Sequence, residues 1–372
     1  RAARPHPRPR TRSRCQPPRP APPPQTMDAA ALAEAVAFLK QKTGGRQAPR
    51  VGVICGSGLS GLVNCLDDKL VVCYEEIPHF PGTTIAGHTG ELVFGNVGKA
   101  SVVLMRGRFH SYEGHDMKTV TDPVKVMRGL GVEIMIITNA AGGVNRSFKV
   151  GDLMLISDHL ALPLLAGKHP LVGPNDASFG GPRFLPLSDA YDPALRQLVY
   201  ETAQSLDMSD FIRPTGTYCF VSGPAYESAA ESKMLLQLGG DSVGMSTIPE
   251  VVVARHCGMK VLGLSLITNQ VRLPGDSGPA ASHEEVLETV AMRSTQIENL
   301  VRTVISKLDA ETWASLESGL AANAEALAAK IASAPAAGAS VKDRLLSMDI
   351  SSMTPLQALN ELNELKKLAA NE

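Results

Sequence analysis

Fully apolar runs alternate with amphipathic segments between Met27 and Leu308, and this alternation limits the fold more than any other feature of the chain. The runs VGVIC (51–55) and VLGLSLIT (261–268) show no regular polar face. Strands of this kind are covered on both sides, which is typical of a largely parallel, doubly wound sheet. The sequence therefore predicts an α/β fold, a single-domain, mixed, largely parallel twisted sheet flanked by helices.

Individual elements follow from the periodicity of apolar residues, which is close to two in strands and 3.6 in helices. Strands are expected at 50–55, 69–74, 91–96, 100–105, 133–138, 152–157, 217–221, 242–244 and 260–268. Helices are expected at 27–43, 117–130, 193–206, 227–238, 249–257 and 283–308.

The two ends of the chain differ from the middle. Residues 1–26 hold seven Arg, nine Pro and no acidic residue, a composition that cannot build an apolar core. They are predicted to form a disordered Arg/Pro-rich leader, with a transit peptide as the alternative. Residues 27–308 are predicted to form the globular domain, and the Ala-rich residues 309–372 a helical C-terminal extension.

Charge and cysteine content exclude several classes of function. Without the leader, 29 basic residues face 37 acidic ones, so a nucleic-acid partner held by a general basic field is not expected. No run reaches the ~18 apolar residues of a membrane span, and no membrane partner is expected. The six Cys occur singly and no His pattern is typical of a metal site, which favours reduced thiols, no metal and a cytoplasmic location.

The segment MRGRFHSYEGH (105–115) concentrates two guanidiniums, two imidazoles and a phenol directly after the expected strand 100–105. Ligands of open α/β sheets bind at the carboxyl ends of strands, and Arg suits the bidentate capture of phosphate or carboxylate. The segment therefore predicts an anionic substrate, with Arg108 and His110 as the binding groups. An exposed basic turn is the alternative.

Three further segments follow expected strands and favour anions. In GSGLSG (56–61), glycines let the backbone approach a ligand and Ser57 adds a hydroxyl; in TNAAGG (138–143), small residues leave N–H groups open. In GMSTIPE (244–250), Thr247 and Glu250 are predicted to form a capping box with Pro249 near the helix start. Ser246 then lies at a helix N-terminus, where anions are favoured. These groups are expected to form one phosphate-sized site.

The GSGLSG turn also allows a different enzyme. Gly56, Gly58 and Gly61 fit G-x-G-x-x-G, and the acids at 75 and 76 follow at the spacing of a ribose-binding residue. An NAD-dependent oxidoreductase is therefore an alternative. That fold needs neither the RGRFH cluster nor a second anion-binding helix start, and no composition break marks a separate substrate domain.

Taken together, the motifs resemble one known family. The segments ICGSGL, PGTTIAGH, RGRFHSYEG, TNAAGGVN, GPNDASFG, GPAYES, VGMSTIPEVVVARHCG, LITNQV and SHEEV look like the trimeric purine nucleoside phosphorylases, in unbroken order from residue 27 to 308. The resemblance implies the nucleoside phosphorylase fold and reversible phosphorolysis of purine ribonucleosides, including inosine, guanosine and their deoxy forms. The products are a free base and ribose 1-phosphate, as in purine salvage. It implies a pentosyltransferase without cofactor, with inorganic phosphate as co-substrate, in a homotrimer.

The resemblance also implies roles for individual residues. Phosphate contacts are implied for Ser57, Arg108, His110, the Ala140 backbone and Ser246, with His88 near the rim. Ribose contacts are implied for Tyr112, Met245, His283 and Phe179, of which Phe179 reaches the neighbouring subunit's site. Purine contacts are implied for Glu227, Asn269, Tyr226, Ala141, Gly142, Val243 and Thr268. The catalytic set is Asn269, Glu227, His110 and His283.

Each assignment has a plainer alternative. Glu227 could cap the helix it begins, Asn269 could satisfy a strand-end carbonyl, and His283 could be an ordinary residue of a helix start. The related methylthioadenosine phosphorylases are a second candidate family, expected to carry acidic groups in place of Asn269 and a small apolar pocket in place of His283. A binding or scaffold protein with this fold is a third reading. Tyr226 replaces the Phe usual in vertebrate-type members, which adds a hydroxyl near the base.

Overall fold

The structure is a computed structural model that describes residues 26–81, 90–175, 181–277, 282–308 and 314, with the side chain of His283 outside the description. Contacts divide the chain into two compact units, Arg1–Trp313 and Ala314–Glu372. Apart from Ala314, the described residues all belong to the first unit. Apart from Thr26 and Ala314, the predicted leader and C-terminal extension therefore lie outside the described residues and stay predictions.

Helices and strands alternate along the described chain. The strands are β1 (Val51–Ile54), β2 (Asp67–Cys73), β3 (Glu91–Val97), β4 (Ala100–Arg106), β5 (Ile134–Gly143), β6 (Leu153–Ile156), β7 (Asp158–Ala161), β8 (Ile212–Arg213), β9 (Thr217–Phe220), β10 (Ser242–Gly244) and β11 (Lys260–Gln270). The α-helices are α1 (Ala29–Thr43), α2 (Met117–Leu130), α3 (Leu162–Leu165), α4 (Pro193–Ser205), α5 (Ala229–Gln237), α6 (Ile248–His256) and α7 (His283–Ser306). Short 3-10 helices are η1 (Leu59–Cys65), η2 (Tyr74–Glu76), η3 (Ser111–Glu113) and η5 (Ser209–Phe211).

Strand β5 is the centre of the sheet because it pairs with three other strands. It is parallel to β1 and β11 and, near its end, antiparallel to β10. From β1 the sheet continues through β4, β3 and β2, and from β10 through β9 to β7, while β11 leads to β6 and β8. Parallel pairs outnumber antiparallel ones among these strands, which confirms the predicted mixed, largely parallel α/β sheet.

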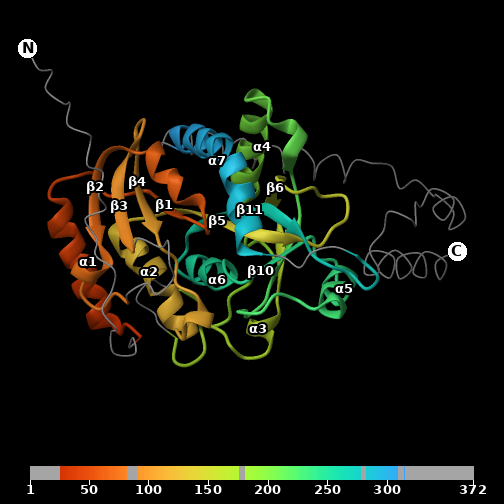
Figure 1. The fold of residues 1–372 in the computed structure, drawn as a ribbon. Helices are drawn as coiled ribbons and strands as arrows, with labels where there is room; N and C mark the ends of the chain where they lie inside the picture. Colours follow the sequence, from red (N-terminus) through yellow and green to blue (C-terminus); the bar gives the residue numbers. More distant parts are fainter. Residues whose placement is uncertain (1–25, 82–89, 176–180, 278–281, 309–313, 315–372) are drawn as a thin grey trace, which may run out of the picture. The chain divides into compact units, whose positions relative to one another are not determined.

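Helices cover both faces of the sheet (Figure 1). Helix α1 packs on α2 and α2 on α6, while α7 packs on η1, β11 and α4. The apolar side chains of β1, β4 and β5 are almost completely buried between these layers, including Ile54, Met105 and Ile137. Burial of such side chains is the main source of stability, at about 25 cal/mol per Å² of apolar surface. None of the described helices is both long and apolar enough to cross a membrane.

Local capping sets the helix boundaries that matter for the site. Asp116 accepts a hydrogen bond from Thr119 N at 2.7 Å where α2 begins, and Gly131, whose φ of +116° suits glycine, caps the end of α2 after Leu130. Ser282 accepts from Glu285 N at 3.2 Å where α7 begins. Helix α5 begins at Ala229 instead of the predicted residue 227, because Ser228 and Glu231 form its capping box.

The strands β5 and β11 extend further than predicted, and the added residues at their carboxyl ends contribute to the candidate site described below. β5 continues through Gly143, so TNAAGG is strand rather than a turn after residue 138, because Ala140 to Gly143 pair with β11 and, at Gly142 and Gly143, with β10. β11 continues to Gln270 and carries one extra residue at Thr268, since Ile267 pairs with Ala141 and Asn269 with Gly142.

Short elements were missed by the sequence prediction. The single-turn helix α3 and the two-residue β8 are too short for a periodic pattern to reveal them, and β7, with the sequence DHLA, lacks the apolar run that marked the predicted strands.

The predicted thiols hold for four cysteines, Cys55, Cys65, Cys219 and Cys257, which are free and buried. The same prediction is wrong for Cys73, which is disulfide-bonded and only partly buried at the end of the outer strand β2.

Candidate active site

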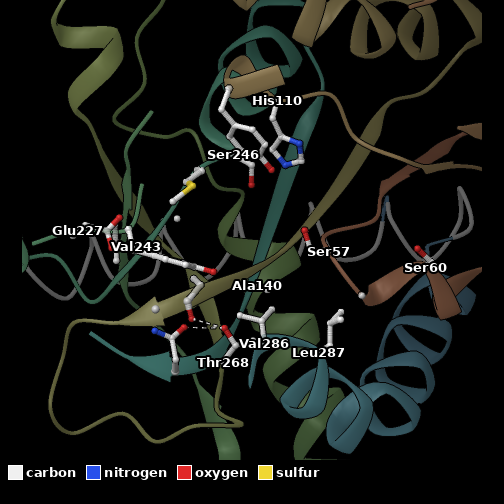
Figure 2. Close-up of a pocket in the computed structure, with 18 residues that line it drawn as sticks. Ser57, Ser60, His110, Ala140, Glu227, Val243, Ser246, Thr268, Val286 and Leu287 are labelled. Atoms are coloured by element: carbon white, nitrogen blue, oxygen red, sulfur yellow. Dashed lines mark hydrogen bonds between the residues drawn. The ribbon is translucent and has the colours of Figure 1, made fainter. Parts of the chain in front are cut away.

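A cavity of about 440 Å³ lies where several parallel strands end (Figure 2). Because β1, β4 and β11 run parallel to β5 or to its neighbour β1, their carboxyl ends share one edge of the sheet. The cavity is lined by Ser57, Gly58, Ser60, His110, Tyr112, Ala140, Ala141, Gly142, Tyr226, Glu227, Val243, Gly244, Met245, Ser246, Thr268, Asn269, Val286 and Leu287. The structure thus brings thirteen of the seventeen predicted site residues to one cavity.

One end of the cavity gathers groups that can bind an anion, which we call the anion end: Ser57, His110, Ala140 and Ser246. They follow β1 and β4, lie on β5 and precede α6, respectively. Beyond the pair Ile54 and Ile137, β1 no longer covers β5, so the backbone at Ala140 faces the cavity without a strand partner on that side. Hydroxyls, an imidazole and backbone amides at a helix start suit phosphate.

Close approach of two backbones forms the floor of the anion end. A Cβ on Gly56 would lie 2.6 Å from Asn139 Cα and 2.7 Å from the Thr138 carbonyl oxygen, so only glycine fits. Gly56 N donates to Thr138 Oγ1 at 2.9 Å, and that hydroxyl donates to the Ile54 carbonyl. Gly56 of the GSGLSG segment therefore allows the backbones after β1 and in β5 to come close, in addition to leaving room for a ligand. The helix after it is the 3-10 helix η1.

Two residues of the RGRFHSYEG segment, Glu113 and Tyr112, fix the imidazole of His110. His110 Nδ1 lies 3.1 Å from Glu113 Oε1, which also accepts from His110 N at 2.9 Å. The ring stacks on Tyr112 with centroids 4.6 Å apart. Burial raises the pKa of Tyr112 to about 12, so its phenol stays protonated and can donate a hydrogen bond.

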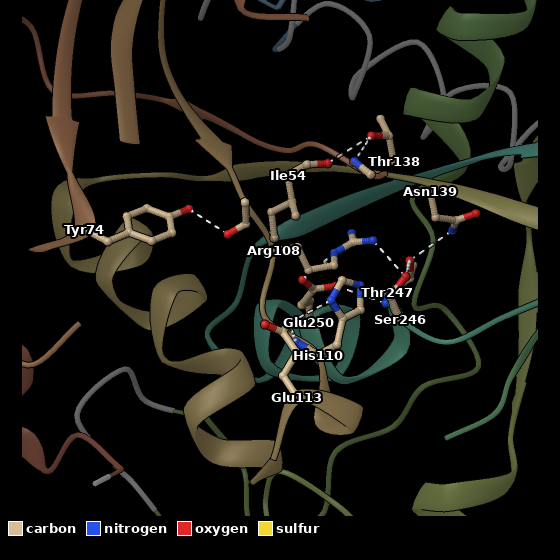
Figure 3. A network of polar contacts seen from close by, with 12 residues as sticks. Ile54, Tyr74, Arg108, His110, Glu113, Thr138, Asn139, Ser246, Thr247 and Glu250 are labelled. Atoms are coloured by element: carbon tan, nitrogen blue, oxygen red, sulfur yellow. Dashed lines mark hydrogen bonds and ion pairs between the residues drawn. The ribbon is translucent and has the colours of Figure 1, made fainter. Parts of the chain in front are cut away.

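Arg108 does not line the cavity, although the sequence places it in the phosphate site. Its side chain is 2% exposed and lies behind Ser246, to whose hydroxyl Nη1 donates at 2.8 Å (Figure 3). Nε donates to Glu250 Oε1 at 2.9 Å, and Nη2 is buried without a hydrogen-bond partner among the described residues. Arg108 therefore reaches the anion end through Ser246 in this structure.

The other end of the cavity carries a carboxylate and an amide, and we call it the base end: Glu227 and Asn269, with Tyr226 beside them. Asn269 is 5% exposed, and its Oδ1 accepts from Thr268 Oγ1 at 3.2 Å. The extra residue in β11 lets the consecutive residues Thr268 and Asn269 both face the cavity. Burial raises the pKa of the Glu227 carboxyl above its ordinary value. Figure 2 shows Glu227 and Val243 on the side opposite Ser57.

Two alternatives from the sequence are wrong. Glu227 is not the cap of α5, because Ser228 and Glu231 hold that position. The acids required for a dinucleotide are not at the cavity: Glu75 and Glu76 are exposed in η2, and Glu76 accepts from Lys42 Nζ at 2.8 Å. The predicted bond between Thr247 N and Glu250 is present at 3.1 Å, and Pro249 is the second residue of α6.

Some predicted residues cannot be placed. His88 and Phe179 lie outside the described residues, and so does the side chain of His283, whose backbone begins α7.

Gly58 is one of the glycines expected to let the backbone approach a ligand, and the four lining residues that were not predicted are Ser60, Gly244, Val286 and Leu287. Val286 and Leu287 lie near the start of α7, and apolar residues at such positions ordinarily indicate packing rather than ligand binding.

The cavity thus joins an anion end to a base end that can bind the polar edge of a heterocycle. Polar groups at both ends come from β5, β11 and the segments beside them, so the strands fix their separation. Within the described part of the chain, no cluster of three or more His, Cys, Asp or Glu is arranged to hold a metal ion.

Known proteins match this chain over its globular unit. A family model described as the Phosphorylase superfamily matches residues 50–306. Purine nucleoside phosphorylase of Bos taurus is 49% identical over 262 residues, covering 70% of this chain and 90% of the relative. Purine nucleoside phosphorylase 1 of Geobacillus stearothermophilus is 45% identical over 282 residues, covering 76% of this chain and 99% of the relative.

A solved structure of purine nucleoside phosphorylase isoform 2 from Schistosoma mansoni, in complex with cytosine and ribose-1-phosphate, has a TM-score of 0.73 and 43% identity. The structural match covers 77% of this chain and 99% of the Schistosoma mansoni chain. The family model, the identities and the shared fold together show that the chain belongs to the phosphorylase superfamily and, within it, to the purine nucleoside phosphorylases.

Proposed function

We propose that the chain is a pentosyltransferase that catalyses reversible phosphorolysis of purine ribonucleosides to the free base and ribose 1-phosphate. The observation that carries this proposal is the single cavity that joins an anion end to a base end. A nucleoside whose base lies at Glu227 and Asn269 directs its ribose toward Ser57, His110 and Ser246, where phosphate would bind.

The chemistry needs groups of these types. Cleavage of the N-glycosidic bond leaves positive charge on the ribose and negative charge on the departing purine. Phosphate at the anion end stabilises the sugar cation and then forms the new C1–O bond. We assign Asn269 to hydrogen bonds with N7 and the 6-oxo group, and Glu227 to accept from N1–H. Donors aimed at developing charge contribute roughly 2.7 to 4 kcal/mol each in a site without water.

The remaining roles rest on the family resemblance. We assign Arg108, the Ala140 backbone and His88 to phosphate, Tyr112, Met245, His283 and Phe179 to ribose, and Tyr226, Ala141, Gly142, Val243 and Thr268 to the purine. Inorganic phosphate enters as a second substrate, and no cofactor is required. We also propose a cytoplasmic homotrimer in which Phe179 reaches the neighbouring site, and a role in purine salvage.

The base end favours 6-oxopurines. Schistosoma mansoni purine nucleoside phosphorylase has been solved in complex with inosine and with adenosine, and a Schistosoma purine nucleoside phosphorylase in complex with guanosine and with hypoxanthine. For this chain, a carboxylate at 227 suits inosine and guanosine because both carry N1–H. The 6-amino purine of adenosine lacks that donor and presents N1 as an acceptor to the carboxylate.

The deciding experiment measures base release from inosine and from adenosine, with and without inorganic phosphate. We expect phosphate-dependent release from inosine and a kcat/KM for adenosine lower by at least about tenfold. Equal rates on both nucleosides would contradict the proposed base preference, and release without phosphate would contradict phosphorolysis.

A further inference from the structure

Glu250 on α6 uses both of its carboxylate oxygens on groups that border the anion end, yet it does not line the cavity (Figure 3). Oε1 accepts from Arg108 Nε at 2.9 Å, and Oε2 accepts from Thr247 N at 3.1 Å. The side chains of both Glu250 and Arg108 are 2% exposed. The carboxylate of Glu250 therefore links Arg108, in the segment after β4, to Thr247, in the turn that begins α6.

The first bond aims a guanidinium. With Nε held by Glu250 and Nη1 donating to Ser246 Oγ at 2.8 Å, the plane of Arg108 is fixed at two points. The guanidinium carries five N–H donors in a rigid fork, so fixing two nitrogens also fixes the third. The third, Nη2, is buried and has no hydrogen-bond partner among the described residues.

The second bond holds a strained turn. Thr247 has φ +79° and ψ −56°, and Ile248 N donates to the Ser246 carbonyl at 2.9 Å, which makes a γ-turn. A β-branched residue at positive φ is an outlier that persists only when its surroundings hold it. Here Glu250 accepts from Thr247 N, and Asn139 Nδ2 donates to Thr247 Oγ1 at 2.9 Å. Ser265 in turn donates to Asn139 Oδ1 at 2.7 Å.

This turn determines where the Ser246 hydroxyl lies. Ser246 precedes Thr247 directly, lines the anion end, and accepts the hydrogen bond from Arg108. Both groups that Glu250 binds, the Arg108 guanidinium and the backbone of Thr247, therefore act on the position of Ser246. A buried ion pair adds little stability over an apolar pair of the same size, so stability alone does not account for a guanidinium and a carboxylate here.

We infer that Glu250 is a positioning residue for the phosphate substrate: it sets Arg108 and the Ser246–Thr247 turn in the geometry that binds the anion. The inference rests on the proposed phosphorolysis and adds to it a residue outside the cavity. Among the described residues, the hydrogen bonds of Glu250 go to Arg108 and Thr247 and none goes to the base end, so its effect should fall on phosphate and leave nucleoside binding in place.

The test compares Glu250→Gln with the wild-type full chain. An amide of the same size accepts only one of the two bonds and turns a donor toward the other partner. We expect KM for phosphate to rise at least about tenfold, because small displacements of binding groups have large effects. KM for inosine should change by less than about threefold. Calorimetric titration with inorganic phosphate should show the same loss of affinity.

A matched control is Asp152→Asn. Asp152 is also a buried carboxylate that accepts from a guanidinium, Arg213, at 2.7 and 3.1 Å, and from a backbone N–H, that of Lys149, at 2.7 Å. It does not line the cavity. We expect Asp152→Asn to lower the melting temperature while KM for phosphate and for inosine stays within about threefold of wild type.

The outcomes separate the two levels of the proposal. A wild-type chain without phosphate-dependent base release overturns the proposed function itself. An active wild type, combined with an unchanged phosphate KM in Glu250→Gln, overturns only the inference about Glu250, as does an equal rise in the KM for inosine. If Glu250→Gln yields no folded protein, Glu250→Asp decides in the same way, because it keeps the charge and shortens the reach.

Discussion

At the scale of single residues, the base end combines Asn269, whose orientation is set by a neighbouring hydroxyl, with Glu227, whose protonation is affected by burial. Asn269 is oriented by Thr268, the residue directly before it in β11. Glu227 lies outside α5 and is affected chiefly by burial, which raises its pKa. The two side chains therefore lend themselves to separate tests, one of transition-state stabilisation and one of protonation.

Replacing Asn269 with Ala should reduce turnover far more than phosphate affinity. The amide would act on charge that develops on the purine only as the bond breaks, so its loss should lower kcat by roughly 10²- to 10³-fold. KM for phosphate should stay within about threefold, since the anion end is separate. Steady-state kinetics with both substrates varied measures this, and Gln197→Ala, an exposed amide on α4, is the control. Unchanged turnover would refute the leaving-group role.

The pH dependence of nucleoside binding should report Glu227. Its pKa is raised by burial, so the carboxylate that accepts from N1–H is lost as the pH falls through that raised value. KM for inosine should therefore begin to rise at a higher pH than the ~4.3 of a free glutamate predicts. Glu227→Gln should raise KM and remove this part of the profile.

Glu231→Gln provides the comparison for that profile. Glu231 is four residues away, and its pKa is lowered by hydrogen bonds from Ser228, so it protonates at lower pH than Glu227. Glu231→Gln should keep this part of the profile, shifted only slightly to lower pH, because burial is the main cause of the raised pKa of Glu227 and the charge of Glu231 a smaller one. A profile that is identical in wild type and Glu227→Gln would show that another group controls it.

The anion-binding residues were readable from the sequence because such groups follow strand ends in a recognisable order, whereas the residues of the base end were predicted only through the family resemblance. The conformation of Arg108 was not readable. Its motif indicates phosphate binding, but Glu250 lies 142 positions further along the chain and holds the guanidinium behind Ser246. A pairing between distant segments leaves no periodic pattern in either one.

At the scale of elements, the site depends on how β1 and β5 separate. The two strands pair as far as Ile54 and Ile137, where the ladder ends, and Gly56 N then bonds to the Thr138 side chain while its backbone still lies against Asn139. The sequence predicted both strands but ended β5 at residue 138. The Ala and Gly residues that follow have weak intrinsic strand preference, and pairing with β11 and β10 keeps them extended.

Gly56→Ala should damage the anion end. The added methyl would lie 2.6 Å from Asn139 Cα, a backbone atom that cannot move alone, so β1 and β5 must separate. We expect a loss of about 1–3 kcal/mol in the free energy of unfolding and a raised KM for phosphate. Chemical denaturation and phosphate kinetics measure the two effects.

Gly52→Ala, in β1 itself, is the matched control for that substitution. Its methyl would meet Met135 and Val132 side-chain atoms at 3.0–3.1 Å, and Met135 is flexible enough to adjust. It should cost less stability and leave KM for phosphate unchanged. If Gly56→Ala were as mild as Gly52→Ala, the close contact of the two backbones would not determine the site.

At the scale of the whole molecule, every described residue of the cavity lies between Ser57 and Leu287, inside the unit Arg1–Trp313. The family match covers residues 50–306. Leu308 is fully buried and its carbonyl accepts from Arg50 Nη1 at 3.5 Å, so the last described turn belongs to this unit. Catalysis and assembly should therefore not require residues 314–372.

A chain that ends at Trp313 should keep kcat/KM for inosine within about threefold of the full chain. Native mass spectrometry should give three times the chain mass for both, which for the full chain means three times 39.4 kDa. Equal activity in a monomer would contradict the proposed reach of Phe179 into a neighbouring site. A trimer formed by the full chain but not by the chain that ends at Trp313 would assign assembly to the C-terminal extension.

The extra residue at Thr268 in β11 also bears on how new base preferences could arise in this enzyme. Side chains alternate along a regular strand, so deleting the extra residue between Ile267 and Asn269 would leave only one of two consecutive side chains facing the cavity. Under the proposed function, the preference for a nucleobase would thus depend on the number of residues in this part of β11 as well as on their types. Libraries that vary the length of this strand segment would sample recognition surfaces that substitution at position 269 never reaches.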